Sequence, residues 1–80
     1  MPPPSWIVKR VLLGPAAVRR AAAARSRDRR ERWMLCQSAA VRRSFVREVL
    51  ERGRNEEAWM LLQPEDVRRS YVAEVLEAEP

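Results

Sequence analysis

Apolar residues recur at helical spacing along two stretches in the second half of the chain. The apolar positions of the first stretch are Val41, Phe45, Val46, Val49 and Leu50. This spacing places them on one broad face of an α-helix, which is typical of a helix that packs against a core. The pattern predicts a helix over about residues 39–52. The same pattern between residues 67 and 76 predicts another helix, which ends at about residue 78.

The two stretches belong to an internal repeat. The nineteen residues that begin at Trp33 and the nineteen that begin at Trp59 are identical at thirteen positions. Self-similarity at a fixed offset, here 26 residues, indicates a duplicated structural unit. A shorter match joins residues 12–21 to residues 35–44. It can be a degenerate third copy or a coincidence between segments rich in Ala and Arg, and the sequence leaves both readings open.

Each clear copy is expected to form two helices joined by a tight turn. Ser38 and Asn55 are residue types that cap helix N-termini. Gly53 suits the left-handed position that follows a helix end. In the second copy a short helix should end at about Leu62, and Pro64 suits the first position of the next helix. These signals predict a helical hairpin in each copy.

The stretch between Pro15 and Gln37 is also expected to be helical. It contains no Gly or Pro and is rich in Ala and Arg, which are good helix formers. A long helix is predicted there, with a restart at Ser26 or Asp28 as the alternative. The run of prolines at residues 2–4 predicts an extended lead-in, because proline does not fit a helix interior.

These patterns together predict an all-α protein without strands. The expected architecture is a tandemly repeated helical hairpin, with two clear copies and a possible degenerate third, behind a basic N-terminal helical segment. The expected boundaries are a partly helical basic segment over residues 1–32 and a duplicated hairpin domain over residues 33–80. The two copies should cover about residues 28–53 and 54–80.

Charge separates these two regions. The formal net charge is +5 and the isoelectric point is about 10.9. Residues 1–32 contain nine basic and two acidic residues, whereas residues 33–80 contain seven basic and nine acidic residues. A strongly basic segment favours polyanions such as nucleic acid or an anionic membrane. The candidate polyanion-binding residues are Arg19, Arg20, Arg25, Arg27, Arg29, Arg30, Arg42 and Arg43.

Arg42, and Arg68 in the second copy, interrupt the apolar face of the predicted helices. Burying a guanidinium is costly unless it is paired. In a structural interpretation, the stem of Arg42 covers apolar surface beside Trp33 and its guanidinium pairs with Glu31. In a functional interpretation, both arginines anchor polyanions or carboxylates. Tryptophan and arginine also anchor many protein interfaces. The candidate protein-interface residues are Trp6, Trp33, Trp59 and Arg68.

The composition argues against catalysis and metal binding. The chain has no His, one Cys, one Tyr and no Gly-rich phosphate loop, so the usual catalytic and zinc-binding constellations are missing. No catalytic, cofactor-binding or metal-binding residue is predicted, and no small-molecule substrate. Cys36 aligns with Leu62 in the repeat, which predicts a small core residue rather than a nucleophile.

The sequence therefore predicts a non-enzymatic interaction module, an accessory or regulatory subunit that binds a protein partner, or itself, through the hairpins. Its basic segment would bind a polyanion. The alternative function is nucleic-acid binding, to DNA or RNA, by a protein that is helix-turn-helix-like or associated with RNA, and the third is association with a membrane surface. No apolar run is long enough to span a bilayer. The expected location is cytoplasmic, or an organellar matrix if residues 1–27 act as a transit segment.

Overall fold

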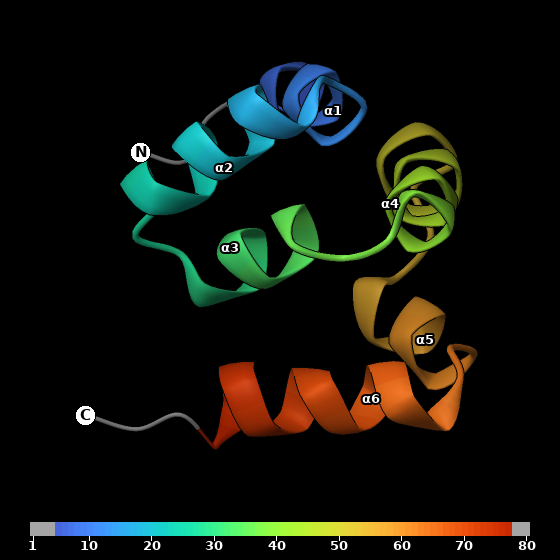
Figure 1. Cartoon of the computed structure of the whole chain (residues 1–80). Helices are drawn as coiled ribbons and strands as arrows, with labels where there is room; N and C mark the ends of the chain where they lie inside the picture. The colour runs from blue at the N-terminus through green and yellow to red at the C-terminus, as the bar shows by residue number, and fades with distance from the viewer. Residues whose placement is uncertain (1–4, 78–80) are drawn as a thin grey trace.

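The computed structural model describes the backbone of residues 5–77 and the side chains of residues 8–77. The helices in Figure 1 are α1 (Ser5–Leu12), α2 (Ala16–Arg25), α3 (Arg29–Leu35), α4 (Ala39–Phe45), α5 (Glu56–Leu61) and α6 (Glu65–Tyr71). Two π-helical turns, η1 (Val46–Glu51) and η2 (Val72–Leu76), continue α4 and α6. No strand occurs in residues 5–77, which agrees with the all-α prediction. The prolines at residues 2–4 lie outside the described residues.

The helices form three consecutive pairs. The N-terminal unit consists of α1 and α2, the middle unit of α3 with α4 and η1, and the C-terminal unit of α5 with α6 and η2. Figure 1 shows α3 between α2 and α6, with α4 and α5 along one side. The N-terminal unit and α6 therefore lie at opposite ends of the molecule.

The helix starts follow capping residues in the sequence. Ser38 Oγ accepts a hydrogen bond from the backbone N–H of Val41 at 3.3 Å. Asn55 Oδ1 accepts one from the N–H of Glu57 at 2.8 Å. Both residues are N-caps, as predicted. Pro64 is itself the N-cap of α6, so that helix begins one residue later than predicted.

The single long helix predicted between Pro15 and Gln37 is wrong. α2 ends at Arg25, and α3 begins only after a break of three residues. Asp28 caps α3, with its carboxylate accepting from the N–H of Arg30 at 2.9 Å. The restart at Asp28 is therefore the correct alternative, because its side chain satisfies N–H groups that have no partner inside a new helix.

The middle unit ends at Gly53 as predicted. Gly53 has a φ of 70°, and its N–H donates to the carbonyl of Val49 at 3.1 Å. Glycine adopts this left-handed conformation without steric cost. The helical path ends at Glu51 in this unit and at Leu76 in the next, close to the predicted ends.

One apolar core joins the three units. Its buried members are Leu12, Trp33, Met34, Leu35, Phe45, Val46 and Trp59. α1 packs against both α3 and η1, and Lys9 on α1 forms an ion pair with Glu51 on η1. The described helices of the basic N-terminal segment are therefore built into the fold.

The middle and C-terminal units contact each other reciprocally. The indole N–H of Trp33 donates to Ser70 Oγ at 2.9 Å, and that of Trp59 donates to Ser44 Oγ at 3.0 Å. Each tryptophan also packs edge to face on a ring of the other unit. The ring pairs are Trp33 with Tyr71, at 5.1 Å between centroids, and Trp59 with Phe45, at 5.2 Å. Equivalent residues, 26 positions apart, thus exchange the same contacts across the junction.

The turns inside the three units also resemble one another. The residue before the second helix has a φ between −57° and −63° and a ψ between 156° and 161° in each unit. In each turn an arginine donates from its guanidinium to the backbone carbonyl five residues earlier. The pairs are Arg19 with Gly14 at 2.6 Å, Arg42 with Gln37 at 3.0 Å and Arg68 with Gln63 at 3.1 Å.

Candidate interaction surfaces

Three large apolar residues of the C-terminal unit are exposed. Leu61 is 73% exposed, Leu76 is 60% exposed and Val72 is 40% exposed. Val72 and Leu76 are one helical turn apart on η2, and Arg68 lies one turn before Val72 on α6. Leu61, Arg68, Val72 and Leu76 are together called the open face below. Leu62, which follows Leu61, is also exposed.

The equivalent positions of the middle unit are buried. Leu35 is 4% exposed, Arg42 is 7% exposed and Val46 is 3% exposed, while Leu50 is half-buried. The four residues are identical to those of the open face, 26 positions earlier in the chain. The difference in burial comes from the N-terminal unit, because α1 packs against α3 and η1, and α2 packs against α3. In the C-terminal unit α3 packs against η2, and this contact leaves Leu61, Val72 and Leu76 exposed.

The four equivalent residues of the middle unit, Leu35, Arg42, Val46 and Leu50, are called the covered face below, and Arg42 is its one charged member. Besides its bond to Gln37, it donates from Nη1 to the carbonyl of Leu12 at the end of α1. That carbonyl is one of the last four of its helix, which have no partner within the helix. Burial lowers the pKa of the Arg42 guanidinium, and the nearby charges of Arg19 and Arg43 lower it further. Arg42 therefore links α1 to the middle unit.

The environments of Arg42 and Arg68 differ from the sequence expectations. The stem of Arg42 is buried as the structural interpretation expects, but its guanidinium bonds to backbone carbonyls rather than to Glu31. A buried guanidinium with these partners is not exposed to an external polyanion. Arg68 is exposed, so it is the member of the pair that an external partner can reach.

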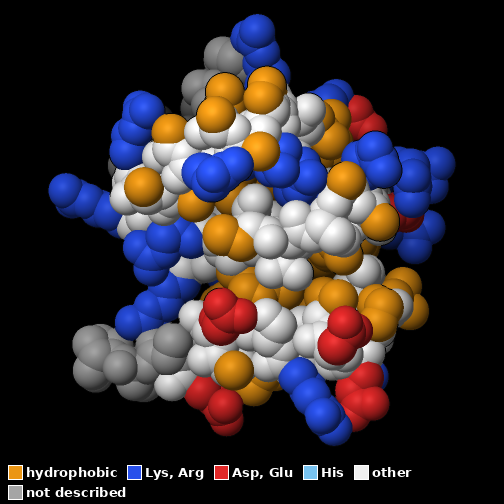
Figure 2. All heavy atoms as spheres, viewed as in Figure 1, with side chains coloured by type: hydrophobic (Ala, Val, Ile, Leu, Met, Phe, Trp, Pro, Cys, Tyr) orange, Lys and Arg blue, Asp and Glu red, His pale blue; other side chains and the backbone are white. Residues whose placement is uncertain are grey.

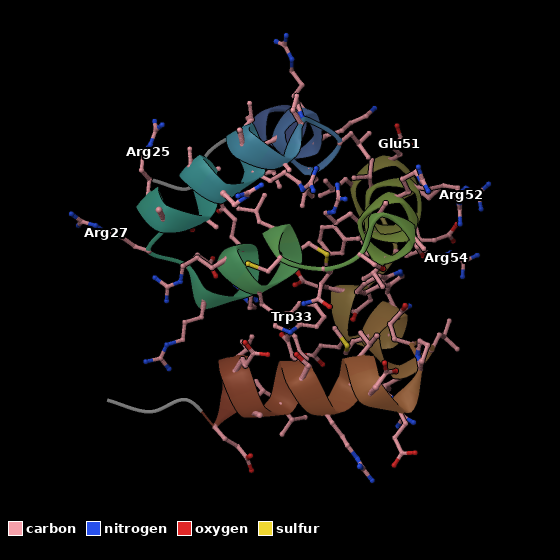
Figure 3. The ribbon with its side chains drawn as sticks, in the orientation of Figure 1. Arg25, Arg27, Trp33, Glu51, Arg52 and Arg54 are labelled. Atoms are coloured by element: carbon pink, nitrogen blue, oxygen red, sulfur yellow. The ribbon has the colours of Figure 1, made fainter. Side chains whose placement is uncertain are left out.

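Exposed arginines lie on α2 and the break that follows it, and others lie on α3 and along α4 and η1. Among the candidate polyanion-binding residues, those that are exposed are Arg20, Arg25, Arg27, Arg30 and Arg43, and those that are half-buried are Arg19 and Arg29. Figure 3 shows Arg25 and Arg27 projecting away from the body of the molecule. In Figure 2, Lys and Arg side chains stand among hydrophobic ones over α1 and α2, whereas acidic side chains gather over α6.

The tryptophans are core residues rather than surface anchors. Trp33 and Trp59 are 4% and 3% exposed, and both are committed to the reciprocal contacts between units. Trp6 lies on α1, and its side chain is outside the described residues. Of the four candidate interface residues, Arg68 is the one whose described side chain is exposed.

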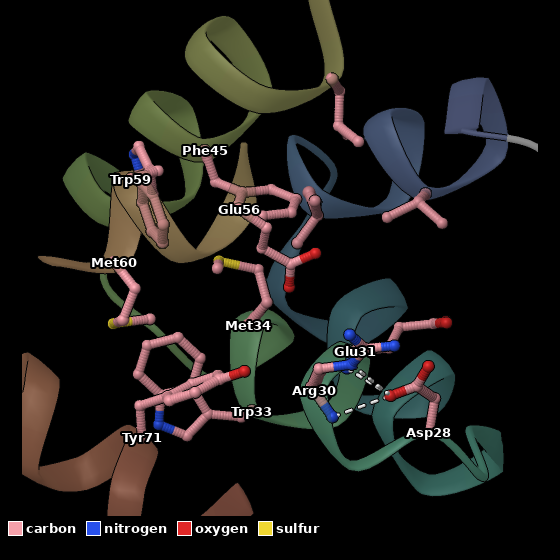
Figure 4. A pocket seen from close by; sticks show the side chains of 13 residues that line it. Asp28, Arg30, Glu31, Trp33, Met34, Phe45, Glu56, Trp59, Met60 and Tyr71 are labelled. Carbon is pink, nitrogen blue, oxygen red and sulfur yellow. Dashed lines mark hydrogen bonds and ion pairs between the residues drawn. The ribbon is translucent and has the colours of Figure 1, made fainter. Parts of the chain in front are cut away.

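A cavity of about 130 Å³ lies where the three units meet (Figure 4). Its wall is apolar and aromatic and includes Met34, Phe45, Trp59 and Tyr71, and Glu31 lies among its polar lining. Burial, together with the charge of Asp28, raises the pKa of Glu31. A space of this size can hold a few water molecules or a small apolar group. Asp28 and Glu56 also belong to its polar lining.

Residues 8–77 hold no group of three or more His, Cys, Asp and Glu side chains placed to bind a metal. Cys36, predicted to be a core residue, is exposed; it is the residue after the end of α3, and its counterpart Leu62 is exposed as well. Within the same part of the chain, every helix is too short or too polar to cross a bilayer.

The open face is the part of the candidate site that the sequence did not single out. Leu61, Val72 and Leu76 have identical counterparts in the first copy, so pattern alone predicts the same burial for both copies. The charge of this region did distinguish it from the first copy, because residues 56–77 contain six acidic residues and two arginines. It marked the C-terminal unit as chemically different from the rest of the chain.

No family model, curated protein or solved structure matches this chain. Its two chemically distinct surfaces, the open face and the exposed arginines, are therefore the basis for assigning a function. Both are defined by side chains whose exposure and contacts are described above.

Proposed function

We propose that the chain is a non-enzymatic helical interaction module, built from tandem helical hairpins, that serves as an accessory or regulatory subunit of a larger assembly. Its C-terminal unit binds a protein through the open face. Its basic N-terminal segment binds a polyanion. Because these surfaces belong to opposite ends of one small fold, the module holds two ligands at a fixed separation.

The main support is the contrast between identical residues in the two copies. Single exposed leucines are common on protein surfaces and need no explanation. Here, however, the exposed residues occupy positions that are core positions in the preceding unit, where Leu35 and Val46 are almost fully buried. Terminal units of repeat proteins usually carry a polar outer face. An apolar outer face on the C-terminal unit is therefore typical of a surface that a partner covers.

The hairpin repeat itself is supported by the recurring turns. Arg19 donates from Nη1 to the carbonyl five residues earlier, as Arg42 and Arg68 donate from Nε to the equivalent carbonyls. This favours the weaker upstream match as a genuine third unit rather than a coincidence between Ala-rich and Arg-rich segments. In this reading the chain is three hairpins, of which the first covers the second.

The protein-binding role is tested by native co-purification of the tagged chain from its source cell after nuclease treatment. We expect a stoichiometric protein partner that is lost from the double variant Leu61→Glu with Leu76→Glu. The matched control is Ala58→Glu with Ala73→Glu, which adds the same charge at exposed positions. Equal recovery of the partner by variant and control would contradict the assignment of the open face.

Nucleic-acid binding is the second candidate, and the exposed arginines favour it. The first 27 residues contain six basic residues and no acid. Arginines presented from helices contact phosphates and position a protein on nucleic acid without reading its sequence. The expected binding is therefore sensitive to salt and insensitive to base sequence.

This candidate is tested with a short DNA duplex and a single-stranded RNA over a range of salt concentrations. We expect the triple variant Arg20→Gln, Arg25→Gln and Arg27→Gln to bind more weakly, with a salt slope smaller by roughly 2 to 3. A matched control removes three other arginines, those that pair with Glu48. The control substitutions are Arg47→Gln, Arg52→Gln and Arg54→Gln. An equal loss in both triple variants would show that net charge, rather than this surface, governs binding.

A further inference from the structure

The open face and the covered face of the middle unit carry the same residues in the same order. The covered face is occupied by α1, which packs against α3 and η1. We infer that the open face binds the C-terminal end of a basic helix from another protein, in the way that α1 binds the middle unit. This inference rests on the proposed function, because it specifies the partner of the same surface. The occupant is defined by three features of α1, each with an unoccupied counterpart on the C-terminal unit.

The first feature is a leucine at the end of the helix. Leu12 is fully buried, at 0% exposed, in the core that also contains Leu35 and Val46. The counterparts of the latter two residues on the C-terminal unit are Leu61 and Val72, which are exposed. A leucine at the end of a docked helix would remove both from water, and burying apolar area is the main favourable contribution to such an association.

The second feature is a free backbone carbonyl. The carbonyl of Leu12 accepts a hydrogen bond from Arg42 Nη1, while Arg42 Nε is held by the carbonyl of Gln37. Arg68 is held in the corresponding way, with its Nε donating to the carbonyl of Gln63. Its guanidinium is thus oriented by its own turn. A helix C-terminus supplies the acceptor that such a donor fits, because its last four carbonyls lack partners within the helix.

The third feature is positive charge one turn before the leucine. Lys9 on α1 forms an ion pair with Glu51, and the residue 26 positions after Glu51 is Glu77, which is exposed. Residues 56–77 carry a net charge of −4, from six acids and two arginines. Charge complementarity therefore favours a basic helix over a neutral or acidic one and increases its rate of association. An acidic helix would be repelled.

Two residues of the open face, Arg68 and Val72, also line a hollow in the surface. The other residues that line this hollow are Glu65, Arg69 and Glu77. Arg69 pairs with Glu65 at 2.6 Å, so its charge is already compensated. Arg68 and Glu77 are left to set the polarity of the bound helix, with its C-terminal carbonyls at Arg68 and its basic side chain at Glu77.

The test uses the full 80-residue chain and a synthetic peptide with the sequence of residues 5–14, amidated at its C-terminus and locked as a helix by a covalent staple. Binding is followed by NMR through the methyl groups of Leu61, Val72 and Leu76. We expect saturable shifts of these three residues at peptide concentrations up to about 1 mM. The Arg68→Met variant should weaken binding about tenfold or more, the effect of losing a hydrogen bond from a charged donor.

Two altered peptides test the other features of the occupant. Replacing the leucine that corresponds to Leu12 with glutamate should abolish the shifts, and replacing the lysine that corresponds to Lys9 with glutamate should weaken binding about fivefold or more. Unchanged binding in either case, or in Arg68→Met, would show non-specific adhesion to exposed leucines and would overturn the inference. Shifts confined to Leu35 and Val46 would also overturn it, because they would mean that the peptide displaces α1.

Two further outcomes separate this inference from the proposed function. If the stapled peptide causes no shifts while Leu61→Glu with Leu76→Glu still abolishes co-purification, the basic-helix occupant is wrong and the protein-binding role of the open face stands. If the open-face residues shift with protein concentration in the absence of peptide, the occupant is a second copy of the chain, and the inference is likewise overturned.

Discussion

Arg42 and Arg68 occupy the same position of the repeat and have opposite environments. Arg42 is buried and donates to the carbonyls of Gln37 and Leu12, whereas Arg68 is exposed. Replacing Arg42 by Met leaves both carbonyls without this donor, and hydrogen bonds from charged donors contribute about 1.5–3 kcal/mol each. We expect Arg42→Met to lower the free energy of unfolding by about 2–4 kcal/mol.

Arg68→Met is the matched control, with an expected change within about 1 kcal/mol because the side chain is exposed. Urea unfolding followed by tryptophan fluorescence measures both variants, since Trp33 and Trp59 are buried in the folded chain. Equal losses of stability in the two variants would contradict a special role for the carbonyl of Leu12.

Glu48 gives the chain a pH-dependent contact. Its carboxylate accepts from Arg47 at 3.0 Å and pairs with Arg52 and Arg54 at 3.1 Å. The hydrogen bond from Arg47 holds the pKa of Glu48 below its ordinary value of 4.5; burial opposes this shift, and the charges of Arg52 and Arg54 add to it. In Figure 3, Arg52 and Arg54 lie together on one side of the molecule.

A lowered pKa in the folded state means that the contact stabilises the chain above the ordinary pKa, and that this contribution is lost as the pH falls through the folded pKa. We therefore expect Glu48→Gln to lower the free energy of unfolding at pH 7 and to have a shrinking effect as the pH falls below about 4.5. Urea unfolding at a series of pH values measures this difference. Glu57→Gln, at an exposed position, is the control, and a constant difference for Glu48→Gln across the series would exclude the mechanism.

At the scale of the elements, local signals located most of the helices. The capping side chains of Ser38 and Asn55 and the left-handed glycine at Gly53 were readable because each acts within a few residues of its own position. The break before α3 was harder to predict. Ala and Arg favour a helix through residues 16–36. The break forms because the side chain of Asp28 caps a new helix at α3, and this single capping interaction outweighs the helix propensity of its neighbours.

The elements also show what a repeat cannot specify. Leu35 and Leu61 end equivalent helices, yet they are 4% and 73% exposed. Leu35→Ala should lower the free energy of unfolding by about 2–5 kcal/mol, because it opens a cavity in the core. Leu61→Ala should change it by less than about 1 kcal/mol. Thermal unfolding followed by circular dichroism compares the two, and similar losses would mean that Leu61 is covered in solution.

At the scale of the whole molecule, the sequence predicted which secondary structure forms but not which helices contact one another. The helical pattern and the charge asymmetry were both readable along the chain. The packing of α1 over the middle unit depends on contacts such as that between Leu12 and Arg42, which are 30 residues apart. The reciprocal pairing of Trp33 with Ser70 and of Trp59 with Ser44 likewise has no local signature. The same two sequences could also pack head to tail, with each unit using a different surface.

These long-range contacts predict that the basic segment cannot be removed without loss of the fold. A chain that starts at Ser26 lacks Leu12, exposes Leu35 and Val46, and leaves the Arg42 guanidinium without its second carbonyl. It is also only 55 residues long, a size at which a domain buries barely enough surface to be stable. We expect this truncated chain to show no cooperative thermal transition by circular dichroism and to bind a hydrophobic dye strongly, unlike the full chain.

A cooperative transition with native-like near-ultraviolet circular dichroism in the truncated chain would show instead that the middle and C-terminal units fold without α1. That result would also weaken the inference about the open face, because α1 would then be a dispensable cover. If the truncated chain unfolds as expected, its failure to bind a polyanion says nothing about which arginines make contact. Charge substitutions at Arg20, Arg25 and Arg27 in the full chain are therefore the sound test of the basic surface, since they leave the core contacts of α1 intact.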